Sequence, residues 1–287
     1  MAETDRRHRF PSWGVVGLLF IAVFWPLNWM LEGLRSHWGF FFLWLGYFFT
    51  VDGLLYIRKG KSLVSSRKAG VIWLFILSSP TWWIFEWMNR QVEFWSYQPP
   101  WPYGQASYVF FCSLNFSVVI PVVFATTQWI GTFKWIREWK RGIKLGGLPA
   151  HIWLIFLLGW LMLFAGLMWP VLGLVFVWMS LFFILDPINY WLGKPSLIAR
   201  TTVGDWRTVF ALWIGCLVCG FFWEMWNYYS SPKWIYHLPF LNSLRIFEMP
   251  LAGYLGYFPF SLELYALFHL VSLKRKDHGL SPIIFIE

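Results

Sequence analysis

Eight apolar stretches, each long enough or nearly long enough to cross a lipid bilayer, constrain what this chain can fold into. A helix rises 1.5 Å per residue, so about 20 residues span the roughly 30 Å hydrocarbon core. With 58% apolar and 13% charged residues in 287, the composition is far from that of soluble domains. We therefore expect an all-α integral membrane protein with about eight transmembrane helices. The predicted spans are residues 12–31, 38–57, 69–88, 106–130, 150–168, 170–191, 206–228 and 248–272.

The distribution of lysine and arginine predicts how these spans are oriented. All but four of the 23 basic residues fall at the two termini or in every second loop. The four exceptions are Arg35, Arg90, Lys233 and Arg245. Because basic residues concentrate in cytoplasmic loops, this alternation predicts a multi-pass protein of the inner (cytoplasmic) membrane with both termini in the cytoplasm. The net charge of +9 is then a signal of topology, and no nucleic-acid partner is expected.

Neither the start of the chain nor its cysteines and histidines indicate processing, disulfides or a metal. The run "MAETDRRHRFPSWGVVGLLF" is typical of a signal sequence, but no small-residue cleavage site follows it, so we interpret it as an uncleaved first span. Cys112, Cys216 and Cys219 fall within predicted spans and are expected to be packing residues. His237 and His269 are expected at the membrane interface. The sequence therefore predicts no disulfide, no metal site and no cofactor.

Internal repetition divides the chain into two halves, residues 1–145 and 146–287. Matching segments are "FWPL" (24–27) with "MWPV" (168–171), "WLGYFFTVDGLLY" (44–56) with "WMSLFFILDPINY" (178–190), and "FWSY" (94–97) with "KWIY" (233–236). The matches occur in the same order, as duplicated units require. Because each half holds four predicted spans, an even number, both halves enter the membrane from the same side. The fold is thus predicted to be two parallel four-helix repeats related by an axis along the membrane normal.

Two glutamates occupy matching positions in the halves. The stretch "WIFEWMN" contains Glu86 and Asn89, and "FFWEMWNYY" contains Glu224 and Asn227. Each Asn follows its Glu by three residues, so the two side chains share a helix face near the outer boundary. Ionisable groups at such depths usually face a bundle interior, and we expect both acids to approach a common cavity. The alternative is structural, since acids near helix ends can accept hydrogen bonds that hold the outer loops.

Asp52 and Asp186 form a second matching pair, predicted to lie deeper, towards the cytoplasm. Each has a tyrosine one turn further along the chain. They are candidates for an inner polar site. The competing interpretation is that Arg58, Lys59 and Lys194 bend back to neutralise them.

Aromatic residues make up 23% of the chain and include 24 tryptophans. Belts of Trp and Tyr at the membrane interfaces explain part of this content. Runs such as "PTWWIFEWM" and "GFFWEMW", however, surround a carboxyl group on several helix faces. A carboxylic acid desolvated by aromatic walls can keep its proton at neutral pH and act as a donor. Because aromatic faces also stabilise cations, such a site suits protonation of an isoprenoid double bond.

The segment "WEMWNYYSSPKWIYHLPFLNSLRIFEMPLAGYLGYFPFSLELY" resembles the small membrane-embedded lycopene cyclase domain of carotenoid biosynthesis. That family has an acid at a helix end, a W-x-Y element and a Pro-Leu-Glu-Glu helix start. The counterparts here are Glu224, Trp234 to Tyr236 and Pro250 to Leu251. The first half matches the pattern more weakly, with Glu86 and Trp95 to Tyr97. "PLAGY" replaces the paired glutamates.

The resemblance implies which side chains carry the chemistry. The acids that remain for catalysis are Glu86, Glu224 and Glu248. The candidates for substrate binding are Asn89, Asn227, Trp95, Tyr97, Trp234 and Tyr236.

Three classes of function follow from these features. The first is a membrane enzyme that acts on an isoprenoid or carotenoid-like lipid by acid–base, non-redox chemistry such as cyclisation or hydration. The second is a non-catalytic membrane subunit that binds pigment, lipid or partner helices, and the third is a proton-coupled transporter. The expected partners are a membrane lipid or polyene substrate and either another membrane protein or a second copy of the chain. The sequence has no nucleotide loop, Asp-rich diphosphate motif or haem-ligand pattern, which argues against an ATP-driven pump, a prenyl-diphosphate transferase or a cytochrome.

Overall fold

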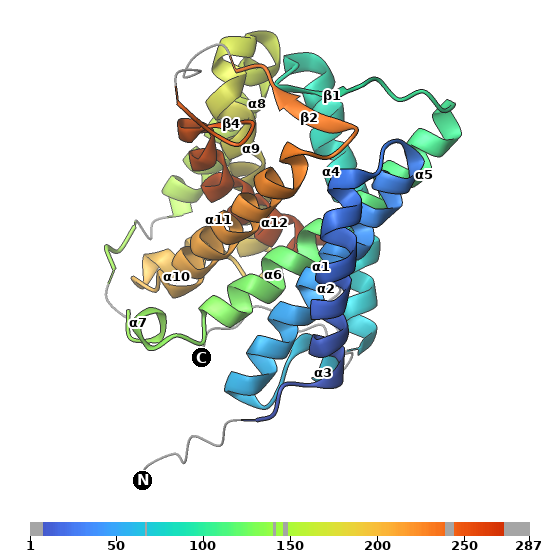
Figure 1. Cartoon of the computed structure of the whole chain (residues 1–287). Helices are drawn as coiled ribbons and strands as arrows, with labels where there is room; N and C mark the ends of the chain where they lie inside the picture. Colours follow the sequence, from blue (N-terminus) through green and yellow to red (C-terminus); the bar gives the residue numbers. More distant parts are fainter. Residues whose placement is uncertain (1–7, 67, 140–141, 146–148, 239–243, 273–287) are drawn as a thin grey trace.

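The computed structural model describes residues 8–66, 68–139, 142–145, 149–238 and 244–272, and this part of the chain is mainly helical (Figure 1). Its elements are α1 (Ser12–Met30), α2 (Leu34–Lys59), α3 (Leu63–Ser66), α4 (Lys68–Val92), β1 (Trp95–Gln98), α5 (Gln105–Phe116), α6 (Val119–Ile130), α7 (Lys134–Arg137), α8 (Pro149–Met168), α9 (Pro170–Trp191), α10 (Leu197–Thr202), α11 (Arg207–Tyr228), β2 (Lys233–Tyr236), β3 (Arg245–Ile246), β4 (Met249–Pro250), the 3₁₀ helix η1 (Leu251–Gly256) and α12 (Tyr257–Val271). Some of the basic residues on which the topology prediction rests lie outside the described residues, as does the boundary between the halves at residue 146. These basic residues are Arg6, Arg7, Arg67, Lys140, Arg141 and Lys274 to Lys276.

Six helical segments in the described part of the chain are long and apolar enough to cross a membrane. They are Ser12–Met30, His37–Lys59, Ala69–Val92, Gln105–Ile130, His151–Met168 and Arg207–Asn227. A shorter apolar helix runs over Val175–Trp191. By length and composition the chain is therefore a helical membrane protein.

Two of the expected spans differ in detail from the structure. The span at 106–130 consists of two helices, α5 and α6, that meet at Ser117 and Val118. The span at 248–272 begins with β4 and η1, and its α-helix, α12, starts only at Tyr257 and has 15 residues. At 1.5 Å per residue such a helix is about 22 Å long, shorter than the hydrocarbon core. The reason lies in "PLAGYLGYFP", where glycines and prolines disfavour a regular α-helix.

The described chain also contains two short antiparallel sheets, which the all-α prediction did not include. Strand β1 pairs with β2, so that Trp95 lies opposite Tyr236, Ser96 opposite Ile235 and Tyr97 opposite Trp234. Strands β3 and β4 form the other sheet. Aromatic and β-branched side chains favour strands, and pairing satisfies the backbone groups of both loops. The first sheet ties together segments far apart in the sequence.

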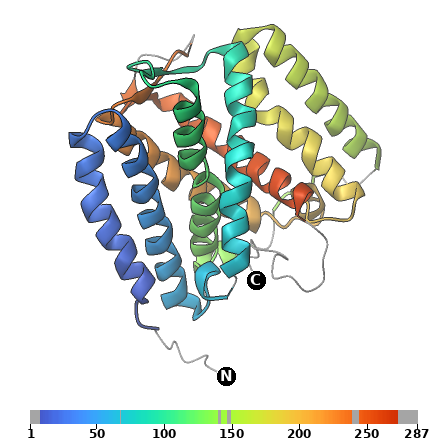
Figure 2. The ribbon, with the colours of Figure 1, turned by 90° about the vertical axis from the view of Figure 1, so that its right-hand side faces the viewer.

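The helices form two flanking pairs around a central group. Helix α1 packs along α2 and α8 along α9, and the two pairs lie on opposite sides of α4, α6, α11 and α12 (Figure 2). Close approach within the first pair depends on glycine, because a Cβ atom added to Gly17 would lie 2.7 Å from the carbonyl oxygen of Gly46. Small residues at such contacts are typical of packing between membrane helices.

The outer faces of α1 and α8 are apolar. On α1, Leu18 and Leu19 are exposed, and on α8, Leu154 and Leu161 are exposed. Exposed leucines in these numbers are unfavourable in water but match a lipid environment. The flanking helices thus present surfaces suited to acyl chains.

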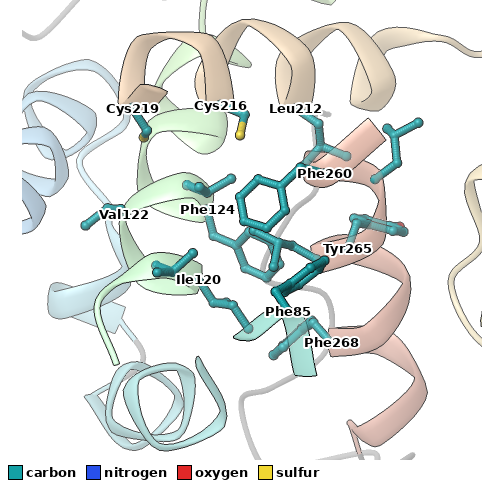
Figure 3. Close-up of a cluster of buried hydrophobic side chains, with 14 of the residues drawn as sticks. Phe85, Ile120, Val122, Phe124, Leu212, Cys216, Cys219, Phe260, Tyr265 and Phe268 are labelled. Atoms are coloured by element: carbon teal, nitrogen blue, oxygen red, sulfur yellow. The ribbon is translucent and has the colours of Figure 1, made fainter. Parts of the chain in front are cut away.

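The core lies where α4, α6, α11 and α12 meet. Figure 3 shows Phe124 of α6, Leu212 of α11 and Phe260 of α12 pointing toward one another, all of them buried. Cys216 and Cys219 belong to the same cluster, and all three cysteines of the chain are free and buried, as predicted for packing residues. Aromatic and aliphatic side chains fill this region.

Candidate functional site

An aromatic cavity of about 540 Å³ lies among helices from both parts of the chain. Its aromatic lining consists of Phe40, Trp82, Phe94, Trp95, Tyr97, Trp101, Tyr108, Phe116, Trp178, Trp223, Trp234, Tyr236, Tyr257 and Phe260. Among the described residues, no Asp, Glu, Lys or Arg contributes to the lining. A concave, mainly apolar site of this size is typical of pockets for small hydrophobic ligands.

Glu224 lies directly behind one wall of this cavity. Its side chain, on α11, is fully buried, and its Oε1 accepts hydrogen bonds from the Tyr236 and Tyr257 hydroxyl groups, both at 2.8 Å. Its Oε2 is enclosed and makes no hydrogen bond to any residue of the described chain. Both tyrosines line the cavity, so they connect the carboxyl group to it. Tyr257, which starts α12, had no signal in the sequence that linked it to this acid.

Glu86 has a corresponding place on α4. Its Oε1 accepts hydrogen bonds from Trp82 Nε1 at 3.0 Å, Trp95 Nε1 at 3.2 Å and the Tyr97 hydroxyl at 2.6 Å. These three aromatic side chains line the cavity, but Glu86 does not. Both acids thus lie next to the same cavity. Each is separated from it by the aromatic side chains to which it is hydrogen-bonded.

The pKa values of Tyr97 and Tyr236, which are hydrogen-bonded to the two acids, are shifted upward. Burial raises the pKa of the Tyr97 and Tyr236 hydroxyl groups well above the usual range, and the neighbouring glutamate raises it further. Both hydroxyl groups therefore keep their protons at neutral pH and act as hydrogen-bond donors. Trp234 supports this arrangement, because its Nε1 donates to the Tyr236 oxygen at 3.0 Å.

Asn89 and Asn227 hold the strands and do not line the cavity. The Asn89 side chain donates to the Trp95 carbonyl at 2.8 Å and accepts from the Trp95 N–H at 3.1 Å. Asn227 makes the same two bonds with Trp234, at 2.8 and 2.9 Å. The two asparagines, expected to bind substrate, thus have no direct contact with the cavity. They position the W-x-Y elements, whose aromatic residues line it.

Glu248 lies apart from the cavity lining. It forms an ion pair with Lys233, the first residue of β2. A carboxylate paired with a lysine next to a strand stabilises the local loop structure, and this geometry gives Glu248 no direct access to a ligand in the cavity.

Asp52 and Asp186 each cap a short helix. Asp186 accepts hydrogen bonds from Ser196 Oγ at 2.7 Å, Leu197 N at 3.0 Å and Ile198 N at 2.8 Å, at the start of α10. Asp52 accepts from Trp13 Nε1 at 3.0 Å and from two backbone N–H groups at the start of α3, at 2.8 and 3.3 Å. Carboxylates at helix N-termini satisfy backbone donors that have no partner within the helix.

Two of the three basic side chains proposed to neutralise these aspartates, Arg58 and Lys194, bond to other groups. Arg58 donates to Thr132 Oγ1 at 2.6 Å and stacks over the Phe133 ring. Lys194 donates to the carbonyl groups of Leu270 and Ser272. Both cations thus reach backbone or hydroxyl oxygens at neighbouring helix ends.

Of the two histidines expected at the interface, His237 is exposed and His269 is buried, and α12 carries a buried acid that the sequence analysis did not single out. His237 bonds to Ser96 Oγ at 2.7 Å, across the strand pair, whereas the His269 ring packs 4.2 Å from that of Tyr265. Glu263 is buried near the backbone of Leu181 and Phe182. A lone acid in "SLELYALF" was the available signal for it.

No metal centre is evident in the described part of the chain, where no group of three or more His, Cys, Asp or Glu side chains has a suitable arrangement. Comparisons with protein-family models, with curated proteins and with solved structures find no match to this chain.

Proposed function

We propose that the protein binds an isoprenoid-like lipid in the aromatic cavity and acts on it by acid–base chemistry without a redox cofactor, as in cyclisation or hydration of a double bond. The observation that carries this proposal is the geometry of Glu224. One buried carboxyl group bonds to two tyrosines that line an apolar cavity, and its second oxygen has no hydrogen-bond partner among the described residues. Such a group is able to hold a proton and to give it up through a hydroxyl group.

The proposed reaction begins with proton transfer to an alkene and ends with the return of a proton to the enzyme. In the protonated form of Glu224, one hydrogen bond to a tyrosine reverses, so that the carboxyl O–H donates to the tyrosine oxygen and the tyrosine hydroxyl turns to the alkene. The carboxyl proton then passes to the tyrosine oxygen while the tyrosine hydroxyl protonates one carbon of the alkene, which leaves a carbocation on the other carbon. A second double bond, or water, then adds to the cation. Loss of a proton back through the tyrosine regenerates the acid. The lining contains faces of Trp178, Trp223 and Phe260, and such faces stabilise positive charge.

A second candidate function is binding without turnover, as in a pigment- or lipid-carrying subunit. It is favoured by the burial of the acids, since Glu224 is 0% and Glu86 only 6% exposed. Their hydrogen bonds also join α4 and α11 to the strand pair, which is a structural task. Both candidates require the same ligand class, and they differ in whether Glu224 gives up its proton.

Analysis of bound lipids tests the ligand class. The protein purified in a mild detergent is expected to retain an isoprenoid-like lipid that mass spectrometry detects. Replacing Ala252, a small lining residue, by Trp should fill part of the cavity and release this lipid. Val15→Trp, on the exposed face of α1, is the matched control and should leave the lipid bound. Equal recovery from both variants, or recovery of phospholipid alone, would contradict a ligand in this cavity.

We further propose eight spans arranged as two parallel four-helix repeats, 1–145 and 146–287, in the inner membrane with both termini in the cytoplasm. Three paired features support this arrangement. Asn89 and Asn227 make the same bonds to β1 and β2, Asp52 and Asp186 each cap a short helix, and β1 pairs with β2 in a symmetric register. In the sequence alignment of the repeats, Trp95 corresponds to Trp234 and Tyr97 to Tyr236. The observed pairing of Trp95 with Tyr236 and of Tyr97 with Trp234 is the one that a two-fold axis passing between Ser96 and Ile235 generates.

Reporter fusions test this topology. Fusions after Lys144 and Arg275 are expected to report a cytoplasmic location, and a fusion near Gln98 the opposite side, because basic loops remain in the cytoplasm. An outside signal after Lys144 would rule out parallel repeats of four spans.

A further inference from the structure

The cavity lining contains two polar side chains that each have one enclosed atom without a hydrogen-bond partner in the described chain. The first is His37, near the start of α2, which lines the cavity. Its ring lies 4.3 Å from the Trp101 ring in an edge-on contact and 6.4 Å from the Phe111 ring. Its Nε2 is enclosed and has no hydrogen-bond partner among the described residues.

The second side chain is Asn115 of α5. This helix turns one face to the cavity, formed by Tyr108, Cys112 and Asn115 at helical spacing. Asn115 lies one turn beyond Phe111, the residue that contacts the His37 ring. Its Oδ1 is also enclosed and without a partner in the described chain. Both side chains thus line the cavity from two helices that contact each other, α2 and α5, and the two residues define one wall of it.

Several other polar groups of the lining are hydrogen-bonded to the protein. Asn28 Nδ2 donates to the Trp226 carbonyl at 2.9 Å, and Ser230 Oγ donates to the Pro232 carbonyl at 2.8 Å. Tyr97 and Tyr236 are bonded to the two glutamates. Because buried polar groups are almost always satisfied in native proteins, the wall formed by His37 and Asn115 calls for a partner that the described residues do not supply.

We propose that this wall binds the hydroxyl group of the ligand, so that the ligand is an isoprenoid alcohol and not a pure hydrocarbon. A hydroxyl group can donate to Asn115 Oδ1 and form a second hydrogen bond with a ring nitrogen of His37. A phosphate or carboxylate fits poorly, since the described lining contains no Lys or Arg to neutralise it. The inference rests on the proposed lipid-binding function and specifies its ligand class.

Retinol and deoxyretinol, the hydrocarbon of the same skeleton, provide the test. Both absorb where tryptophan emits, so binding to a cavity lined by Trp82, Trp101 and Trp178 is measured as loss of tryptophan fluorescence in the full-length protein. Retinol is expected to bind at least about tenfold more tightly, because only its hydroxyl group satisfies the two polar side chains. His37→Phe and Asn115→Leu should each reduce this preference while deoxyretinol binding is kept. Phe110→Leu, on the exposed face of α5, is the control that should retain the preference.

Each outcome has a defined meaning. Equal affinity of the wild type for the two compounds would overturn the alcohol subsite and leave the proposed function standing. A preference for retinol that survives both substitutions would also overturn it, because the hydroxyl group would then bind elsewhere. Failure to bind either compound would overturn the subsite together with the proposed ligand class. Deoxyretinol binding reports folding, and Asn115→Ala replaces Asn115→Leu if the larger side chain prevents folding.

Discussion

Glu224→Gln is expected to preserve ligand binding and to lower conversion of the bound isoprenoid by at least about 100-fold. In the wild type, the hydroxyl groups of Tyr236 and Tyr257 each lie 2.8 Å from Glu224 Oε1. The amide oxygen of Gln can still accept hydrogen bonds from both, so the cavity wall should remain in place. The amide has no acidic proton to pass to an alkene. Conversion is measured by chromatography of extracts from membranes supplied with the lipid that mass spectrometry identifies.

Glu86→Gln is the matched control for this prediction. Glu86 Oε1 already accepts three hydrogen bonds, from Trp82, Trp95 and Tyr97, and a structural role predicts a change in melting temperature with conversion largely kept. Tyr257→Phe tests the route of the proton, because it removes one of the two hydroxyl groups between Glu224 and the cavity. If the Glu224→Gln variant turns over its substrate at the wild-type rate, acid catalysis by this residue is excluded and binding without turnover becomes the better function.

Asp186→Ala is expected to destabilise the protein by about 3 kcal/mol or more, because it leaves three buried donors without an acceptor. These donors are Ser196 Oγ and the backbone N–H groups of Leu197 and Ile198, and Asp186 itself is fully buried. For a chain of this size, a loss of that stability corresponds to a melting temperature lower by roughly 5 °C or more. Thermal unfolding in a mild detergent measures it.

Comparison with two further variants identifies the cause. Asp52→Ala removes the equivalent cap of α3 and should give a loss of similar size. Glu138→Ala breaks an exposed ion pair with Lys134, in which the Glu138 side chain is 65% exposed, and should change stability by less than about 0.5 kcal/mol. Unchanged melting of Asp186→Ala together with lost activity would assign the aspartate to an inner functional site instead of a structural cap.

Several local features of the site were predictable because they depend on short segments. The pairs Glu86–Asn89 and Glu224–Asn227 are visible as repeats, and each Asn bonds to a residue only six or seven positions further on. Asp186 could be located in the same way, but its role could not. Sequence proximity to Lys194 indicated neutralisation, whereas the turn after α9 brings the start of α10 closer and presents its free N–H groups.

The composition and periodicity of the sequence by themselves determined the helical membrane class, since the lengths of apolar runs and the burial of cysteines follow from the preference of apolar groups for lipid and core. Only the tertiary structure decided what faces the cavity. Its lining combines His37, Asn115 and Tyr257 from three different helices, and whether a carboxyl group meets a ligand or lies behind a tyrosine depends on how those helices pack. Glu224 could be recognised as unusual from its neighbours in the chain, but its hydrogen bond to Tyr257, 33 residues away, exists only because α11 packs against α12.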